Sequence, residues 1–200
     1  APVAVREVLL APGERGIYLV RVPSDAPSPV KLERLYYDRF HVPNQVPAVR
    51  WGGIDVVANP RPSRWTPPAT LAPFEPPATT SAVTRRLSLD EVADPDGARF
   101  VISGTGLQHG MFRAWQDTVE VWELTNTTNN DHPIHLHGFI FHLLDPRPDD
   151  VVGWRDTVNV RPDETLRIAV PFDDRTGPWM LHCHVLDHSD AGMMAHVQLE

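Results

Sequence analysis

Histidines are concentrated in two short segments of this chain. Eight of the ten lie between His132 and the end of the chain, and most of these fall in His132–Gly138 (HPIHLHG) and His182–His188 (HCHVLDH). Imidazole nitrogens and cysteine thiolates are both good ligands for transition metals, and the single cysteine, Cys183, lies in the second segment. The clustering therefore predicts metal binding.

The spacing within each segment predicts how the ligands are divided between two metal sites. Successive side chains of a strand point to opposite faces, so His135 and His137 are expected to lie on one face of a strand. In the same way His182 and His184 share a face, and Cys183 points away from both. One strand would then serve two sites.

A second ligand set is expected around the cysteine. Met193 follows Cys183 by ten residues and His188 by five, with Gly192 beside it, so a loop can bring them together. If His132 supplies a second imidazole, the set contains two histidines, one cysteine and a weak axial methionine. That is the ligand set of a blue copper site.

Two other chemistries compete with copper. A thiolate with imidazoles also suits zinc, although a structural zinc site closes at four ligands and more candidates are present here. A Cys–His nucleophile is disfavoured because the strand directs Cys183 away from His182 and His184. The remaining histidines are interpreted as packed or solvated side chains: His41, His109, His142 and His196.

Short apolar runs separated by turn residues follow Ser81 and predict an all-β fold, with a spacing typical of a β-sandwich. No helix of three turns is evident. The predicted strands are Val83–Leu89, Arg99–Ser103, Val119–Thr125, Ile134–Leu144, Thr157–Val160, Thr165–Val170, Trp179–Val185 and Ala195–Leu199.

The first 80 residues have a different character. Val3–Leu10 and Ile17–Val22 flank a turn at Ala11–Gly16 and predict a hairpin, which is marginal alone and is expected to complete a domain whose remainder lies elsewhere. Prolines crowd the segment from Pro43 to Pro77 and predict a connector. We therefore divide the chain into residues 1–40, the connector 41–80 and a domain at 81–200.

Composition excludes some classes of partner. Lys and Arg total 18 against 26 Asp and Glu, for a net charge of −8 without a basic cluster, so a nucleic-acid partner is not expected. No apolar run is long enough for a membrane span. The chain starts at Ala1 without a signal peptide or initiator Met, so we expect it to be processed or excised.

The two histidine segments resemble the C-terminal copper-binding signatures of multicopper oxidases, the laccase-like family. HPIHLHG followed by HCHVLDHSDAGMM carries the resemblance, which extends from about Val83 to the end of the chain. It implies a cupredoxin-like Greek-key β-sandwich at 81–200. The segment ending at Arg15 (LLAPGER) also resembles the end of the preceding cupredoxin domain of three-domain members.

Carried over by position, the resemblance implies copper of three types. The type 1 copper ligands would be His132, Cys183, His188 and Met193. His135 would bind the type 2 copper, and the type 3 pair would be bound by His137, His182 and His184.

The resemblance also implies a reaction, in which single electrons from a phenolic or aromatic amine reductant pass through the type 1 site to a trinuclear cluster that reduces dioxygen to water. This family's cluster uses eight histidines, of which this chain offers four. We therefore expect a C-terminal part of a longer oxidase, active only with an N-terminal cupredoxin portion, and working in an extracellular or periplasmic location.

Some alternatives stay open. An electron carrier would use only the type 1 site. A nitrite reductase places one histidine beside the cysteine rather than two, and oxidases of cuprous ion carry methionine-rich segments.

Many bacterial three-domain members have Glu after the type 1 histidine as a proton relay, whereas this chain has Ser189. Protons must then pass through Asp190, Asp187, water or a carboxylate of the missing part.

Overall fold

The computed structural model describes residues 4–22, 28–38, 47–55, 66, 68–69, 75–95, 97–147, 150 and 153–200. Contacts between Cα atoms divide the chain into two compact units. One comprises Ala1–Val8 and Arg15–Pro73, and the other comprises Leu9–Glu14 and Phe74–Glu200. The short Leu9–Glu14 segment therefore belongs to the unit that contains both histidine segments.

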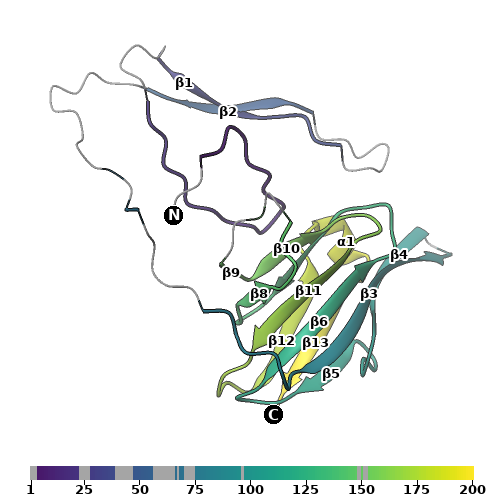
Figure 1. The fold of residues 1–200 in the computed structure, drawn as a ribbon. Coiled ribbons are helices and arrows are strands. Elements are labelled where there is room, and N and C mark those ends of the chain that lie inside the picture. The colour runs from purple at the N-terminus through teal and green to yellow at the C-terminus, as the bar shows by residue number, and fades with distance from the viewer. Residues whose placement is uncertain are drawn as a thin grey trace. The chain divides into compact units, whose positions relative to one another are not determined.

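The second unit is a sandwich of two sheets (Figure 1). One sheet has the strand order β10-β7-β12-β13-β5, and the other has the order β4-β3-β6-β11-β8-β9. Two pairs are parallel, β3 with β6 and β13 with β5. The strands are β3 (Val83–Asp94), β4 (Gly97–Gly104), β5 (Met111–Ala114), β6 (Val119–Asn126), β7 (His132–Leu136), β8 (Phe141–Leu143), β9 (Trp154–Arg155), β10 (Thr157–Val160), β11 (Thr165–Pro171), β12 (Gly177–Cys183) and β13 (Met194–Leu199).

Alternating side chains build the core between the sheets. In β3, Leu87 and Leu89 are buried while their neighbours are more exposed, and in β11 Leu166 and Ile168 follow the same period of two. Trp122 of β6 is fully buried among them. This pattern confirms the all-β fold and the sandwich predicted from the sequence.

A buried ion pair lies at one end of this core. Arg85 of β3 donates from Nε to Glu120 of β6 at 2.9 Å, and the indole N–H of Trp122 donates to the same carboxylate at 2.7 Å. The guanidinium also donates to the carbonyl oxygens of Thr105 and Arg113. Each charge is therefore hydrogen-bonded, as a buried pair requires.

The predicted run Ile134–Leu144 is wrong as a single strand. It divides into β7 and β8 because Gly138 has φ +75°, which lies in the left-handed region and turns the chain out of the extended conformation, and Trp179 occupies the space a Cβ would need. The sequence also gave no indication of β5, β9 or the five-residue helix α1 (Leu186–Asp190).

Among its described residues, the first unit contains an antiparallel pair of strands, β1 (Val30–Arg34) with β2 (Val49–Ile54). Residues 4–22 form no ladder with any described residue, so the predicted strands Val3–Leu10 and Ile17–Val22 are not found there, and Val3 lies outside the described residues. Of the predicted connector, residues 41–46, 56–65, 67 and 70–74 lie outside the described residues, and β2 occupies a further part of it.

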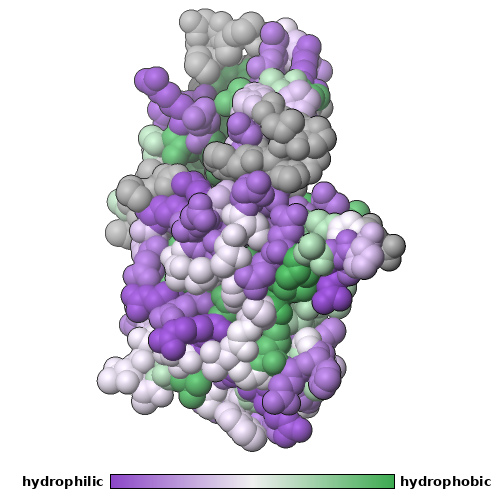
Figure 2. All heavy atoms as spheres, turned by 90° about the vertical axis from the view of Figure 1, so that its right-hand side faces the viewer, coloured by the Kyte–Doolittle hydropathy of each residue, from purple (hydrophilic) through white to green (hydrophobic). Residues whose placement is uncertain are grey.

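In Figure 2 the surface of the sandwich that faces the viewer is mostly hydrophilic, and its hydrophobic residues gather in one stripe. Among the residues that the structure describes, no helix is both long enough and apolar enough to cross a membrane.

Candidate metal centre

The pairing of β7 with β12 brings the two histidine segments together. His182 lies opposite His135, and Cys183 lies opposite Ile134. Because side chains alternate, the first pair points to the outer face of the sheet and the second pair points into the sandwich. His132 is two residues from Ile134 and also points inward, so the same two strands carry two different clusters.

The inner cluster joins His132, Cys183 and His188. The Sγ atom of Cys183 lies 3.7 Å from Nδ1 of each histidine, and the two Nδ1 atoms are 3.2 Å apart. All three side chains are buried, and their ligand atoms lie within 4.8 Å of one another. Three donor atoms that converge in this way can share one metal ion.

Hydrogen bonding determines the tautomer of His132. The hydroxyl of Thr128 donates to Oδ1 of Asn126 at 2.9 Å, so it accepts at 2.7 Å from Nε2 of His132. The amide of Asn126 is oriented because its Nδ2 donates to the carbonyl oxygens of Asn130 and Val160. With the proton on Nε2, the lone pair of Nδ1 faces Cys183.

Two further residues enclose the inner cluster. Met193 is fully buried, and its carbonyl oxygen accepts from the Cys183 N–H at 3.1 Å while its own N–H donates to the His188 carbonyl. The Phe100 ring packs on His188, with 4.2 Å between centroids and 31° between planes. The cluster is therefore shielded from solvent, and the exposed fraction of His188 is 2%.

The outer cluster gathers four imidazoles. The ligand atoms of His135, His137 and His182 lie within 4.8 Å of one another, and the Nε2 atoms of His137 and His182 are 3.0 Å apart. The ring of His184 lies 5.6 Å from that of His182 and 5.7 Å from that of His135. His137 and His184 are exposed, so this cluster is open on one side.

Main-chain carbonyl groups orient two of these rings. Nδ1 of His135 donates to the carbonyl oxygen of Asp156 at 2.9 Å, and Nδ1 of His182 donates to that of Cys183 at 2.7 Å. Each ring then presents the lone pair of Nε2 to the cluster, as a metal ligand must. Burial lowers the pKa of His135 and of His182, which favours the neutral form of both rings.

The structure places the other predicted residues elsewhere. Asp190 ends α1 and is exposed, whereas the buried Ser189 donates its hydroxyl to the Leu186 carbonyl oxygen at 2.9 Å. His109 and His142 lie outside both clusters, His196 is exposed on β13, and His41 lies outside the described residues.

Several supporting residues were missed by the sequence analysis. Thr128 lay in a segment interpreted only as a turn, Phe100 was assigned only to a strand, and Gly13 was assigned to a turn with no link to the histidines. An Asn-Thr-Thr run before the first histidine segment was the one available signal, since such side chains bond locally to the backbone.

Comparisons with known proteins agree with the chemistry of these two clusters. A family model described as "Multicopper oxidase" matches residues 81–200. The chain belongs to the multicopper oxidase family. The chain is 33% identical over 150 residues to a laccase from Haloferax volcanii, an alignment that covers 61% of this chain and 26% of the laccase. It is 36% identical over 99 residues to a laccase from Bacillus subtilis, covering 38% of this chain and 19% of that protein.

The structure of this chain is similar to the crystal structure of McoA multicopper oxidase from Aquifex aeolicus. The TM-score is 0.67 at 26% identity, and the match covers 85% of this chain and 40% of that one. The chain thus spans about a fifth to a quarter of the two laccases, at 19% and 26%.

Membership in this family implies copper and an oxidoreductase, and the residues present fit that metal. Two imidazoles, a thiolate and a buried methionine are the donors that copper takes in electron-transfer sites. The outer imidazoles are neutral nitrogen donors that also suit copper.

Proposed function

We propose that this chain is the C-terminal part of a laccase-like oxidase. The reaction oxidises phenols or aromatic amines by one electron at a time and reduces dioxygen to water. Four electrons and four protons convert each dioxygen molecule into two water molecules, so four reductant molecules each give up one electron.

Each cluster has a distinct part in this proposal. His132, Cys183, His188 and Met193 would hold the type 1 copper. His135 would hold the type 2 copper, and the type 3 pair would be held by His137, His182 and His184. Copper at these positions supplies one-electron redox chemistry at the inner cluster and dioxygen reduction at the outer one.

The covalent link between the clusters carries the proposal. Cys183 points into the sandwich, while its neighbours His182 and His184 belong to the outer cluster. A few bonds of the backbone therefore connect a buried thiolate with the imidazoles on the opposite face. The His182 Nδ1–H bond to the Cys183 carbonyl, at 2.7 Å, adds a second connection. An electron carrier that used only the inner cluster would need neither feature.

An N-terminal cupredoxin portion of the same oxidase completes the outer cluster in this proposal. His137 and His184 are exposed on the open side, where four more histidines would be added. Apolar side chains of residues 4–22 are also exposed, including Ile17 at 98% and Val20 at 69%. In this proposal these apolar side chains become buried in contact with the N-terminal cupredoxin portion. We place the oxidase in an extracellular or periplasmic location.

Phenols and aromatic amines are favoured over metal ions as reductants. Oxidases of cuprous ion carry methionine-rich segments, and this chain has four methionines in all, of which Met193 is assigned to the inner cluster. Steady-state oxidation of a phenol and of cuprous ion by the same preparation tests this choice.

Copper per chain in the native purified particle, measured with the visible absorption spectrum, tests the function. About four copper ions with an intense blue band support an intact oxidase with its N-terminal portion. About one copper with the same band would instead leave an electron carrier. Loss of dioxygen uptake when this chain is purified alone is the expected companion result, and full uptake by the isolated chain contradicts the need for a partner.

A further inference from the structure

A tight turn far from the histidines in sequence lies against the outer cluster. At Gly13 the space for a Cβ atom is occupied by the imidazole of His184, whose Cδ2 and Cγ would lie 2.5 Å and 2.8 Å away. The backbone of Gly13 therefore covers the ring at van der Waals distance. His184 is exposed, and this contact restricts the side chain on one side.

The turn Ala11–Glu14 is rigid for local reasons. Pro12 presets its own φ, and Gly13 adopts φ +83°, the combination expected at the two central positions of a type II turn. The N–H of Glu14 donates to the Ala11 carbonyl oxygen at 3.0 Å, and the Glu14 carboxylate accepts from the Ala11 N–H at 2.9 Å. Both ends of the turn are thus closed by hydrogen bonds.

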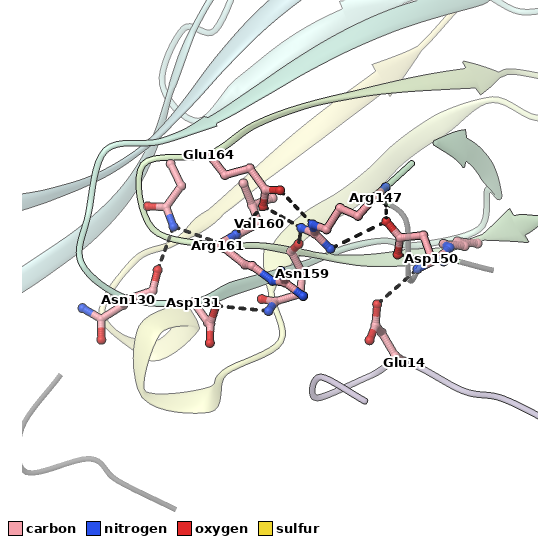
Figure 3. Close-up of polar contacts among 11 residues, drawn as sticks. Glu14, Asn130, Asp131, Arg147, Asp150, Asn159, Val160, Arg161 and Glu164 are labelled. Carbon is pink, nitrogen blue, oxygen red and sulfur yellow. Dashed lines mark hydrogen bonds and ion pairs between the residues drawn. The ribbon is translucent and has the colours of Figure 1, made fainter. Parts of the chain in front are cut away.

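Polar contacts attach this turn to the strands behind the cluster. Figure 3 shows Glu14 at one end of a series of contacts that leads to Asp150, Arg147 and Glu164. Arg155 lies between them, 3.6 Å from the Glu14 carboxylate and 3.1 Å from that of Asp150. Burial raises the pKa of Glu14, while the Ala11 N–H and Arg155 oppose that shift. The Glu14 carboxylate therefore anchors the turn to Arg155 of β9, while Pro12 stays exposed.

Thr157 connects the same turn with a second histidine. Its Oγ1 lies 3.4 Å from the Gly13 carbonyl oxygen, 3.0 Å from the Asp156 carboxylate and 3.0 Å from Nδ1 of His135. Thr157 is 2% exposed and pairs directly with His135 across β10 and β7. One turn therefore contacts His184 through Gly13 and His135 through Thr157.

We propose that the turn Ala11–Glu14 is a positioning element of the outer cluster, which holds the ring of His184 and, through Thr157, the ring of His135 in place to bind metal. Gly13 and Thr157 are its positioning residues. The inference rests on the proposed function, because it assigns the turn to the site of dioxygen reduction.

Substitution of two glycines separates positioning from backbone strain. Gly13→Ala adds a methyl group against His184, whereas Gly110→Ala adds one at a similar φ of +75° with no atom within 4 Å. In the copper-loaded oxidase both variants keep the blue band of the inner cluster. Gly13→Ala lowers dioxygen turnover by about 10- to 100-fold and changes the electron paramagnetic resonance of the type 2 copper, and Gly110→Ala changes neither. Equal spectra and equal turnover for the two variants overturn the inference.

Thr157→Val tests the second contact without a clash. It removes the hydroxyl at nearly constant volume, and we expect the same spectroscopic change as for Gly13→Ala, with Thr157→Ser restoring the wild-type spectrum. A wild-type spectrum for Thr157→Val removes Thr157 from the proposal.

A measurement on the metal-free protein keeps this inference distinct from the proposed function. Modification of His184 by diethyl pyrocarbonate, followed by mass spectrometry, should change in rate for Gly13→Ala and not for Gly110→Ala. If the wild-type particle holds one copper and takes up no dioxygen, the proposed function fails, and the modification rates still decide whether the turn holds His184. If the wild-type particle is an oxidase and the rates are equal, only the inference fails.

Discussion

The two histidine clusters use the same pair of strands in different ways. The inner cluster is 0–2% exposed at His132, Cys183 and His188, and all of its candidate ligands come from this chain. The outer cluster has two exposed histidines, His137 and His184, and is open on one side. A strand pair can thus support one candidate metal site enclosed within the sandwich and another that is open on one side.

The supports of the two clusters differ as well. The inner cluster relies on side chains, with Thr128 and Asn126 orienting His132. The outer cluster relies mainly on main-chain carbonyl groups, those of Asp156 and Cys183, with the Thr157 hydroxyl as a side-chain contact of His135. Substitution can remove a side-chain support directly but reaches a main-chain support only through the fold, so the two clusters should respond differently to mutation.

The largest effect is expected from removing one ligand of each cluster in turn. Cys183→Ser should abolish the blue band and lower activity by more than the roughly 100-fold typical of lost outer-shell partners. His182→Asn should keep the blue band and abolish dioxygen uptake. Copper content, visible spectra and oxygen consumption are measured, with exposed His196→Asn as the control that changes none of them. Loss of the blue band in His182→Asn would show that the clusters are not separate.

The next largest effect is expected from Thr128→Val, which should change only the inner cluster. Valine leaves Nε2–H of His132 without an acceptor, which should weaken copper binding there by about 10- to 100-fold. Competition with a chelator, followed by the blue band, measures the change. Thr128→Ser should restore affinity because it retains the hydroxyl, and a Ser variant as weak as the Val variant would point to packing instead.

Acidification should weaken metal binding at the outer cluster. Burial lowers the pKa of His135 and of His182 below the ordinary value of 6.5, so the neutral form of each ring predominates at pH 6.5. Once the pH falls below their lowered values, metal affinity should drop about tenfold per pH unit for each ligand that must lose a proton. Copper content after equilibration on both sides of 6.5 measures this, and loss that begins above 6.5 contradicts it.

The same pKa shifts affect the metal-free protein. The folded state binds fewer protons than the unfolded state at these histidines, so their contribution to the free energy of unfolding is present above 6.5 and is lost as the pH falls through the lowered values. Thermal unfolding of the metal-free chain across this range should show that decline.

The smallest effect is expected at the exposed Asp190. If this carboxylate relays protons to reduced oxygen, Asp190→Asn should slow oxygen reduction several-fold while reduction of the inner cluster by substrate keeps its rate. Single-turnover measurement of the two half-reactions tests this. Equal effects on both half-reactions would argue against a relay, and Asp187→Asn serves as the neighbouring comparison on α1.

Local periodicity was enough to predict much of this protein. The all-β sandwich followed from short alternating runs, and the opposite directions of Cys183 and His182 followed from the period of two in a strand. The candidate ligands were recognisable because their types and spacing are local properties. The division of Ile134–Leu144 at Gly138 was missed because an apolar run does not reveal a positive φ.

Tertiary structure decided what lies next to those ligands. Alternation assigns a side chain to a face but does not choose the partner strand, so the pairing of His182 with His135 comes only from the fold. The hydroxyl that sets the tautomer of His132 and the glycine that covers His184 are likewise defined by contacts in space. Gly13 and His184 are far apart in sequence, and such non-local contacts depend on the packing of the whole sandwich rather than on any local pattern of residues.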